Sequence, residues 1–332
     1  MNLSTRISVL YRLGDYLKTD VPAYDEAILR ASRENKWFTQ EYIKIAGKAI
    51  AESMLNKATL ESIAEQYNIL PHPSCSKTVG LVMAGNIPYV GVQDLVCTFL
   101  AGHKSRIKTS SKDSILLSHL LEVMVTVDPA VAEWIKIQDM LKDCDAYIAT
   151  GSDNSARYFE FYFSKYPHII RKNRTSIGIL DGNETAEELE NLADDIQMYF
   201  GLGCRNITQI WVPEGYDFLP LLNALRKYDE YKNHDKYRNN FDYQLTISIM
   251  NNRFYMSNDS IVLLENPSPF SPISQLHYQF YKDKNSVADN LDQDKIQCLV
   301  GRGHVPFGRA QQPSLTDFPD GVDLLEFLKS LT

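Results

Sequence analysis

The chain has 332 residues, of which 34 are Lys or Arg and 42 are Asp or Glu, so its formal net charge is −8. This length suits two domains, and the acidic balance argues against nucleic acid as the main partner. No apolar run reaches the roughly 18 residues that a membrane helix needs, and the N-terminus lacks the basic-then-apolar order of a signal peptide. We therefore expect a cytoplasmic protein without a membrane span.

The N-terminal part of the chain is predicted to be helical. "KIAGKAIAESML" and "ATLESIAEQY" repeat apolar residues with the period of a helix, and Pro71–Ser74 breaks this pattern. A strand at 78–83, a tight loop at 84–88, a helix ending at Gly102 and a second strand from 104 follow. This order is the βαβ unit from which parallel nucleotide-binding sheets are built.

Strand and helix patterns go on alternating, which predicts an α/β fold. The remaining predicted strands are at 145–152, 175–180, 207–212, 260–265 and 276–282, and the helices are at 113–125, 129–142, from 154 and at 185–201. The predicted domains are N-terminal helices with a Rossmann-type dinucleotide-binding domain at 1–175, a second α/β domain at 176–300, and a C-terminal loop and tail at 301–332.

The five cysteines are scattered and never spaced C-x-x-C, so neither a disulfide framework nor a zinc ribbon is expected. The histidines show no metal-binding spacing either. Cys204 stands apart because it follows Gly-Leu-Gly and precedes an apolar, β-branched run. The pattern places Cys204 on a turn that enters a buried strand, where it is a structural thiol, a metal ligand or a nucleophile.

The predicted strand at 145–152 ends at Gly151-Ser152 and leads into a helix. Backbone N–H groups and a hydroxyl at a helix N-terminus form a ready anion site. The glycines of the chain match neither G-x-G-x-x-G nor the phosphate loop G-x-x-x-x-G-K-S. A dinucleotide would therefore bind by another arrangement.

Five stretches in order resemble the aldehyde dehydrogenase superfamily, and more closely its acyl-CoA reductase branch, typified by the reductase component of the fatty acid reductase complex of luminous bacteria. The resemblance runs from about Val79 to the C-terminus, and "GLGCRN" is its most branch-specific stretch. The five are "GNIPYVG", "RIKTSS", "ATGS", "GLGCRN" and "GHVPFGRAQ".

The resemblance implies an acyl transfer to Cys204 from acyl-CoA or another acyl thioester, followed by reduction to an aldehyde. The amide of Asn86 and the Cys204 backbone N–H would hold the oxyanion, and His304 would donate a proton. The residues implied in cofactor binding are Lys108, Ser111, Lys112, Gly151, Ser152 and Glu265. A homo-oligomer paired through the C-terminal strand is also implied, with an acyl-transferring protein as a further partner.

Two departures from the superfamily pattern bear on the chemistry. The stretch Ile169–Ser176 lacks the glutamate with which hydrolytic members activate water, so the expected product is an aldehyde. Ser111, next to Lys112, replaces a glutamate that would repel a 2′-phosphate. The resemblance therefore predicts NADPH as the cofactor, with NADH as the alternative.

Several of these residues also have a plain structural interpretation. Asn86 would form a turn, Lys108 would be a solvated lysine, Ser152 a helix cap and His304 a hydrogen-bond partner. Arg302 and Arg309 would face either CoA phosphates or solvent. At the level of the whole chain, the alternatives are an acid-forming aldehyde dehydrogenase, a reductase of acyl phosphates, and a non-catalytic scaffold that binds nucleotide or acyl groups.

Overall fold

The computed structural model describes residues 1–72 and 75–331, and its chain divides into two compact units. Unit 1 comprises Met1–Asn173 and Gln312–Thr332, and unit 2 comprises Arg174–Gln311. The predicted segment 301–332 is therefore not a unit of its own, because the division at Gln311 cuts through it. Of the predicted break at Pro71–Ser74, residues 73 and 74 lie outside the described residues.

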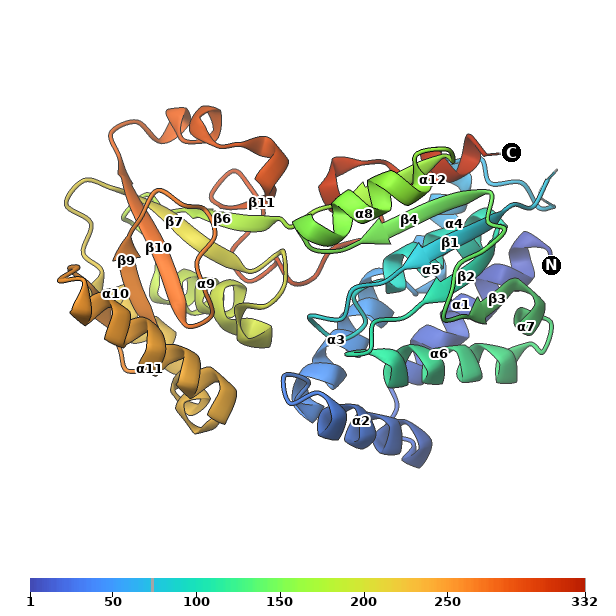
Figure 1. Cartoon of the computed structure of the whole chain (residues 1–332), viewed down its shortest axis with the longest axis horizontal. Coiled ribbons are helices and arrows are strands. Elements are labelled where there is room, and N and C mark those ends of the chain that lie inside the picture. The colour runs from blue at the N-terminus through green and yellow to red at the C-terminus, as the bar shows by residue number, and fades with distance from the viewer. Residues whose placement is uncertain (73–74, 332) are drawn as a thin grey trace. The chain divides into compact units, whose positions relative to one another are not determined.

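Unit 1 is built on a five-stranded parallel sheet in the order β3-β2-β1-β4-β5 (Figure 1). Its strands are β1 Thr78–Val82, β2 Lys104–Lys108, β3 Ile135–Ile137, β4 Ala146–Thr150 and β5 His168–Arg171. Its helices are α1 Leu3–Leu17, α2 Pro22–Glu34, α3 Gln40–Ser53, α4 Lys57–Gln66, α5 Val92–Ala101, α6 Ser114–Val127, α7 Val131–Trp134, α8 Asp153–Phe163 and α12 Leu324–Lys329.

The predicted βαβ unit is present as β1, α5 and β2. Gly102 ends α5 with a φ of 89°, a left-handed conformation that glycine adopts without strain. Val79 and Leu81 of β1 are buried, as are Phe99 and Leu100 of α5, and these side chains contribute to the core of unit 1. Apolar burial of this kind contributes roughly 1.5–3 kcal/mol for each large side chain.

One prediction for unit 1 is wrong. The expected helix at 129–142 is only α7 followed by β3, because Ile135 and Ile137 extend the sheet by pairing with β2. The described residues 312–331 contain no strand within this chain, and the pairing of segment 301–332 with another subunit remains a prediction. They form α12 instead, which packs against α5, and both are seen in unit 1 in Figure 1.

Unit 2 is a six-stranded sheet in the order β11-β6-β7-β10-β9-β8, parallel except for the β8–β9 pair. Its strands are β6 Thr175–Ile179, β7 Ile207–Pro213, β8 Met256–Ser257, β9 Val262–Glu265, β10 Gln275–Tyr281 and β11 Ile296–Gly301. Its helices are α9 Ala186–Gln197, α10 Leu219–Ala224 and α11 Asp235–Met250, with 3-10 turns η1 Met198–Gly201, η2 Leu225–Asn233, η3 Lys284–Ser286, η4 Ala288–Asn290 and η5 Gln293–Lys295; η6 Pro319–Gly321 belongs to unit 1.

Helix α9 leads toward Cys204, and its start is encoded locally. The Thr185 hydroxyl accepts a hydrogen bond from the Glu188 N–H at 3.2 Å, and the Glu188 carboxylate accepts one from the Thr185 N–H at 2.8 Å. This reciprocal capping satisfies two amide groups that the helix itself leaves without partners. The strand after the cysteine, β7, begins at Ile207 as predicted. The mixed helices and parallel sheets confirm the predicted α/β class.

Candidate active site

The predicted catalytic residue Asn86 and the predicted cofactor residues of unit 1 lie at one edge of its sheet. Asn86 follows β1, Ser111 and Lys112 follow β2, and Gly151 follows β4. Because these strands are parallel, their carboxyl ends share an edge. The strand order switches from one side of β1 to the other between β3 and β4. Ligands of open α/β sheets bind in the crevice at such a switch point.

The loops after β1 and β2 lie against each other. A Cβ on Gly85 would lie 2.7 Å from the Cβ of Ser110, so the close approach requires glycine. The carboxylate of Asp113 accepts a hydrogen bond from the backbone N–H of Tyr89 at 2.8 Å, and Tyr89 has a φ of 62°. These contacts hold the loop of Asn86 against the loop of Ser111.

Asp113 is a buried carboxyl that the sequence did not single out. Burial raises its pKa to about 8, while the Tyr89 N–H acts in the opposite direction. Its second oxygen has no hydrogen-bond partner among the described residues. Asp113 directly precedes α6, a position typical of a helix cap. Its side chain makes no capping hydrogen bond, however, because it is buried. Lys108, Ser111 and Lys112 are exposed instead.

The turn at Gly151-Ser152 has a clear structural role. Ser152 is the cap of α8, and its hydroxyl accepts a hydrogen bond from the Ser155 N–H at 3.4 Å. A Cβ on Gly151 would lie 2.8 Å from that of Ser155, and the Gly151 N–H donates to the Arg171 carbonyl at 3.2 Å. The contact of this turn with a pyrophosphate remains a prediction.

In unit 2, Cys204 is partly exposed on the turn between η1 and β7. Tyr199, Phe200 and Gly201 precede it with φ values of 55°, 58° and 72°. A left-handed conformation costs a residue other than glycine on the order of 1 kcal/mol or more. The Phe200 ring packs 4.4 Å from the ring of Tyr231, as measured between centroids, and this contact supports the strained backbone.

Asn206 braces the cysteine turn. Its amide accepts a hydrogen bond from the Gly203 N–H at 2.8 Å and donates to the carbonyl of Met198 at 2.9 Å and to that of Ile196 at 3.3 Å. Asn206 is fully buried, so the loss of these bonds would leave several polar groups without partners. The sequence showed Asn206 inside "GLGCRN", but nothing there distinguished a brace from an exposed turn residue.

A second buried aspartate, Asp195 of α9, holds the Pro-Phe-Gly loop. Its two oxygens accept hydrogen bonds from the N–H groups of Gly308 at 2.6 Å and Ala310 at 3.0 Å. Burial raises the pKa of Asp195 to about 7, and the two N–H groups act in the opposite direction. Sequence patterns gave no sign of this contact, because Asp195 occupies a position of α9 that reads as polar.

His304 lies exposed on the turn after β11, and its N–H donates to the Gly301 carbonyl at 3.0 Å. The Arg302 side chain already forms ion pairs within the protein, so it is not available to a CoA phosphate without breaking them. Its guanidinium is 2.7 Å from the Glu188 carboxylate and 3.1 Å from that of Asp181. Arg309 is exposed on the Pro-Phe-Gly loop.

Glu265 is exposed at the end of β9. The segment after it is tied to β7, because the Gln209 amide donates to the carbonyl of Asn266 at 2.9 Å and to that of Ser268 at 3.2 Å. Glu265 therefore has a fixed backbone position and an accessible carboxylate. Its role as a ribose ligand remains a prediction.

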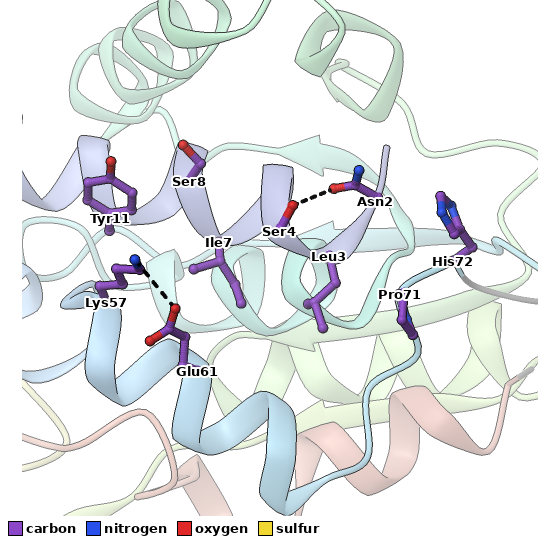
Figure 2. A pocket seen from close by; sticks show the side chains of 10 residues that line it. All are labelled: Asn2, Leu3, Ser4, Ile7, Ser8, Tyr11, Lys57, Glu61, Pro71 and His72. Carbon is purple, nitrogen blue, oxygen red and sulfur yellow. Dashed lines mark hydrogen bonds and ion pairs between the residues drawn. The ribbon is translucent and has the colours of Figure 1, made fainter.

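A cavity of about 570 Å³ in unit 1 contains none of these residues. Figure 2 shows it between α1, α4 and the segment at Pro71, with Lys57 and Glu61 forming an ion pair 3.6 Å long. In the part of the chain that the structure describes, no group of three or more His, Cys, Asp or Glu residues could hold a metal ion. No described helix is long and apolar enough to cross a membrane.

Comparison with solved structures identifies the fold. Aldehyde dehydrogenase 21 from Physcomitrella patens superposes with a TM-score of 0.66 at 11% identity, covering 87% of this chain and 71% of that one. An aldehyde dehydrogenase from Mycobacterium tuberculosis, solved with NAD+, gives a TM-score of 0.63 at 13% identity, covering 86% and 70%. The fold is therefore that of the aldehyde dehydrogenases, as predicted.

Comparison with curated proteins gives more specific relatives. The chain is 25% identical over 259 residues to a long-chain acyl-protein thioester reductase of Aliivibrio fischeri, covering 68% of this chain and 53% of the relative. It is 23% identical over 283 residues to a second such reductase, from Photobacterium leiognathi, covering 75% and 59%. The chain thus spans little more than half the length of these relatives.

The family model described as acyl-CoA reductase (LuxC) matches residues 16–218. The matched segment includes the cysteine turn and every predicted cofactor residue of unit 1, but neither Glu265 nor His304. Because the match covers more than half of the chain, the suspected family is confirmed. The chain belongs to the acyl-CoA reductase (LuxC) family.

Proposed function

We propose that this protein reduces an acyl thioester to an aldehyde through a covalent acyl group on Cys204. The observation that carries the proposal is the position of Cys204, which lies within the family match on a partly exposed turn braced by buried hydrogen bonds. A thiol held at the surface by rigid backbone suits a nucleophile better than a core residue.

In the first half of the proposed reaction, the Cys204 thiolate attacks the carbonyl carbon of the thioester. The backbone N–H of Cys204 stabilises the resulting oxyanion, with the Asn86 amide as the second donor that the family resemblance implies. The bond to the leaving thiol then breaks, and the leaving sulfur takes up a proton, for which His304 is the proposed source.

In the second half, a nicotinamide cofactor, when bound, would supply the hydride that reduces the carbonyl of the Cys204 thioester. The same donors stabilise the second oxyanion, the bond to the Cys204 sulfur breaks, and aldehyde leaves. The thiolate of Cys204 is regenerated, so one hydride and one proton are consumed for each aldehyde formed.

The exposed edge of unit 1 suits a nicotinamide dinucleotide. We propose that Lys108, Ser111 and Lys112 bind the adenosine ribose and its 2′-phosphate, so that NADPH is preferred and NADH is used less well. The inward position of Asp113 supports this choice, because its carboxyl is buried and does not repel a phosphate at the exposed edge. Gly151 and Ser152 would meet the pyrophosphate, and Glu265 the other ribose.

The acyl donor is proposed as CoA or a protein that carries the acyl group as a thioester. The two curated relatives are named as reductases of long-chain acyl-protein thioesters, which favours a long acyl chain and keeps a protein donor open beside CoA. Self-assembly into a homo-oligomer remains a prediction.

Intact-protein mass spectrometry after incubation with long-chain acyl-CoA, in the absence of nucleotide, tests the proposal. One acyl group should appear on Cys204 and CoA should be released. Cys204→Ser should abolish the label, while Cys75→Ser, which alters an exposed cysteine, should keep it. A label on Cys75 or Cys298, or no label, would overturn the assignment.

Two outcomes would favour the alternative functions. Release of free acid when aldehyde and oxidised nucleotide are supplied would indicate an acid-forming dehydrogenase. Binding of acyl-CoA that blocks labelling of Cys204 by a thiol reagent, without any transfer of the acyl group, would indicate a scaffold.

A further inference from the structure

We propose that Ser176 is a positioning residue for the Cys204 turn and that the thiol of Cys298 supports it by a hydrogen bond. This inference rests on the proposed function, because it assigns to Ser176 the fixing of the peptide that follows the proposed nucleophile. All three residues lie in unit 2, with Ser176 on β6 and Cys298 on β11.

The Ser176 hydroxyl contacts two groups at once. Its oxygen lies 3.1 Å from the backbone carbonyl oxygen of Cys204 and 3.1 Å from the sulfur of Cys298. The hydroxyl has one proton, and a carbonyl oxygen can only accept, so that proton goes to Cys204. The Cys298 thiol must then be the donor to the Ser176 oxygen.

The direction of both bonds follows from this assignment. The Cys298 S–H donates to Ser176, and the Ser176 O–H donates to the Cys204 carbonyl. Successive donors polarise one another, so a chain of this kind holds the carbonyl more firmly than a lone hydroxyl would. Ser176 is fully buried, which keeps water from competing for the Cys204 carbonyl.

The other side of Cys204 is fixed by Asn206. The carbonyl of Gly203 accepts a hydrogen bond from the Asn206 backbone N–H at 3.0 Å, and the Gly203 N–H is held by the Asn206 side chain. In a planar trans peptide the N–H points opposite to the carbonyl. The Cys204 N–H therefore points away from Asn206, in a direction set before any substrate arrives.

Both peptide groups flanking Cys204 are thus held, one by Asn206 and the other by Ser176. Oxyanion stabilisation depends on donors that are oriented in advance, and removing one donor costs about 10² to 10³ in rate. Asn206 orients the Cys204 N–H, while Ser176 holds the peptide that follows Cys204 and so limits rotation of the Cys204 backbone. Ser176 is not itself a donor to the oxyanion, so its loss should cost less. The loss should slow the acyl transfer and leave substrate binding unchanged.

Ser176→Ala is the first test, with Ser248→Ala as the matched control. Ser248 is also a buried serine of unit 2 whose hydroxyl donates to a backbone carbonyl, that of Gln244 at 2.8 Å. Single-turnover acylation of Cys204 by acyl-CoA should slow roughly tenfold in Ser176→Ala. This effect is about ten times smaller than the rate loss expected when an oxyanion donor is removed. KM should stay within about twofold, and Ser248→Ala should acylate at the wild-type rate.

Alkylation by iodoacetamide separates positioning from a general effect on the thiol. This displacement forms no oxyanion, so its rate at Cys204 should change by less than about twofold in Ser176→Ala. Cys298→Ala should slow acylation, whereas Cys298→Ser, which keeps a hydrogen-bond donor, should restore it. A parallel fall in alkylation and acylation, or equal rates for the two Cys298 variants, would contradict the proposal.

Amide hydrogen exchange provides a readout that needs no substrate. The amides of residues 203–206 should exchange faster in Ser176→Ala than in the wild type, and unchanged exchange would overturn the inference on its own. If the wild-type protein takes up no acyl group, the proposed function falls as well. If the wild type and Ser176→Ala take up acyl groups at the same rate, only the role of Ser176 falls.

Discussion

In each unit one buried aspartate holds a loop, but in different ways: Asp113 holds the loop after β1 at the proposed cofactor edge of unit 1, and Asp195 holds the Pro-Phe-Gly loop of unit 2. Asp113 receives one backbone N–H, that of Tyr89, while Asp195 receives two, those of Gly308 and Ala310. Burial raises the pKa of Asp113 to about 8 and that of Asp195 to about 7. In both groups the backbone N–H donors act in the opposite direction, which offsets part of the cost of burying a carboxylate.

The two regions differ also in what they expose. Unit 1 presents Lys108, Ser111 and Lys112 on its surface, so substitutions there should change ligand preference without disturbing the backbone. Unit 2 holds Cys204 by the buried side chains of Ser176 and Asn206, so substitutions there should act on the chemistry. The following experiments test this division.

The largest effect is expected for Cys204→Ala. Loss of the proposed nucleophile should lower the rate of aldehyde formation by roughly 10⁴-fold or more, as the loss of a catalytic nucleophile does in other enzymes that form covalent intermediates. Lys108→Ala in unit 1 should raise KM for the nucleotide and leave kcat almost unchanged. Steady-state kinetics with both variants measures this contrast. A Cys204→Ala variant that retains more than about 1% of the activity would contradict it.

The acylated Cys204 should survive in water. A positioned general base contributes roughly 10² to 10⁴ in rate, and the stretch Ile169–Ser176 offers none. The Arg171 side chain in this stretch is bound to Asp94 at 2.7 Å, and both are buried. Free acid should therefore appear at least about 10²-fold more slowly than aldehyde forms once NADPH is added.

The rate of label loss from isolated acyl-enzyme, measured by mass spectrometry with and without NADPH, checks this expectation. Equal rates in both conditions would mean that another residue supplies the base. His304→Ala would then be the next variant, since His304 is exposed on the turn after β11. A hydrolytic function would replace the reductase assignment.

The two buried aspartates should give each unit a pH-dependent stability. The pKa values of both groups in the folded protein exceed the unfolded value of about 3.9. The folded state therefore binds more protons than the unfolded state, between about pH 4 and pH 7 at Asp195 and between about pH 4 and pH 8 at Asp113. The free energy of unfolding contributed by each group should therefore fall as pH rises through its window. Below about pH 4 both groups are protonated in the folded and the unfolded state, so their contribution is fully present there and no longer changes with pH.

Asparagine variants should separate the two cases. Asp113→Asn can keep its bond to the Tyr89 N–H, because the other oxygen has no partner among the described residues, and should stabilise unit 1 at pH 8. Asp195→Asn must turn an NH₂ group toward a backbone N–H and should loosen the Pro-Phe-Gly loop. Amide exchange at Tyr89 and at Gly308, corrected for intrinsic rates, reports each unit. Matching responses of the two variants would contradict the comparison.

Local patterns predicted the elements around the site because their signals are short in range. The apolar run after Cys204 indicated β7, and Gly102 marked the end of α5. Asp113, Asp195 and Asn206 were missed because their roles depend on partners in other segments: Tyr89 for the first, Gly308 and Ala310 for the second, and the end of α9 for the third. The edge strand β3 was missed because only pairing with β2 distinguishes Ile135–Ile137 from the end of a helix.

The smallest effect concerns cofactor choice at the exposed edge of unit 1. The side chains of Ser111 and Lys112 are exposed, and the neighbouring carboxyl of Asp113 is buried and bound to Tyr89. A 2′-phosphate would thus meet a hydroxyl and a cation, so kcat/KM should favour NADPH over NADH. One ion pair at an exposed site suggests about tenfold, or about 1.4 kcal/mol.

Ser111→Glu should reverse or abolish the preference by adding a carboxylate that repels the 2′-phosphate and can bind the ribose hydroxyls of NADH. Ser111→Gln has nearly the same size without the charge, so it separates repulsion from crowding and should change the preference much less. Because these groups are exposed, salt screens their attraction, and the preference for NADPH should shrink as ionic strength rises. A wild-type preference for NADH, or equal effects of Glu and Gln, would mean that the exposed groups of unit 1 do not select the cofactor.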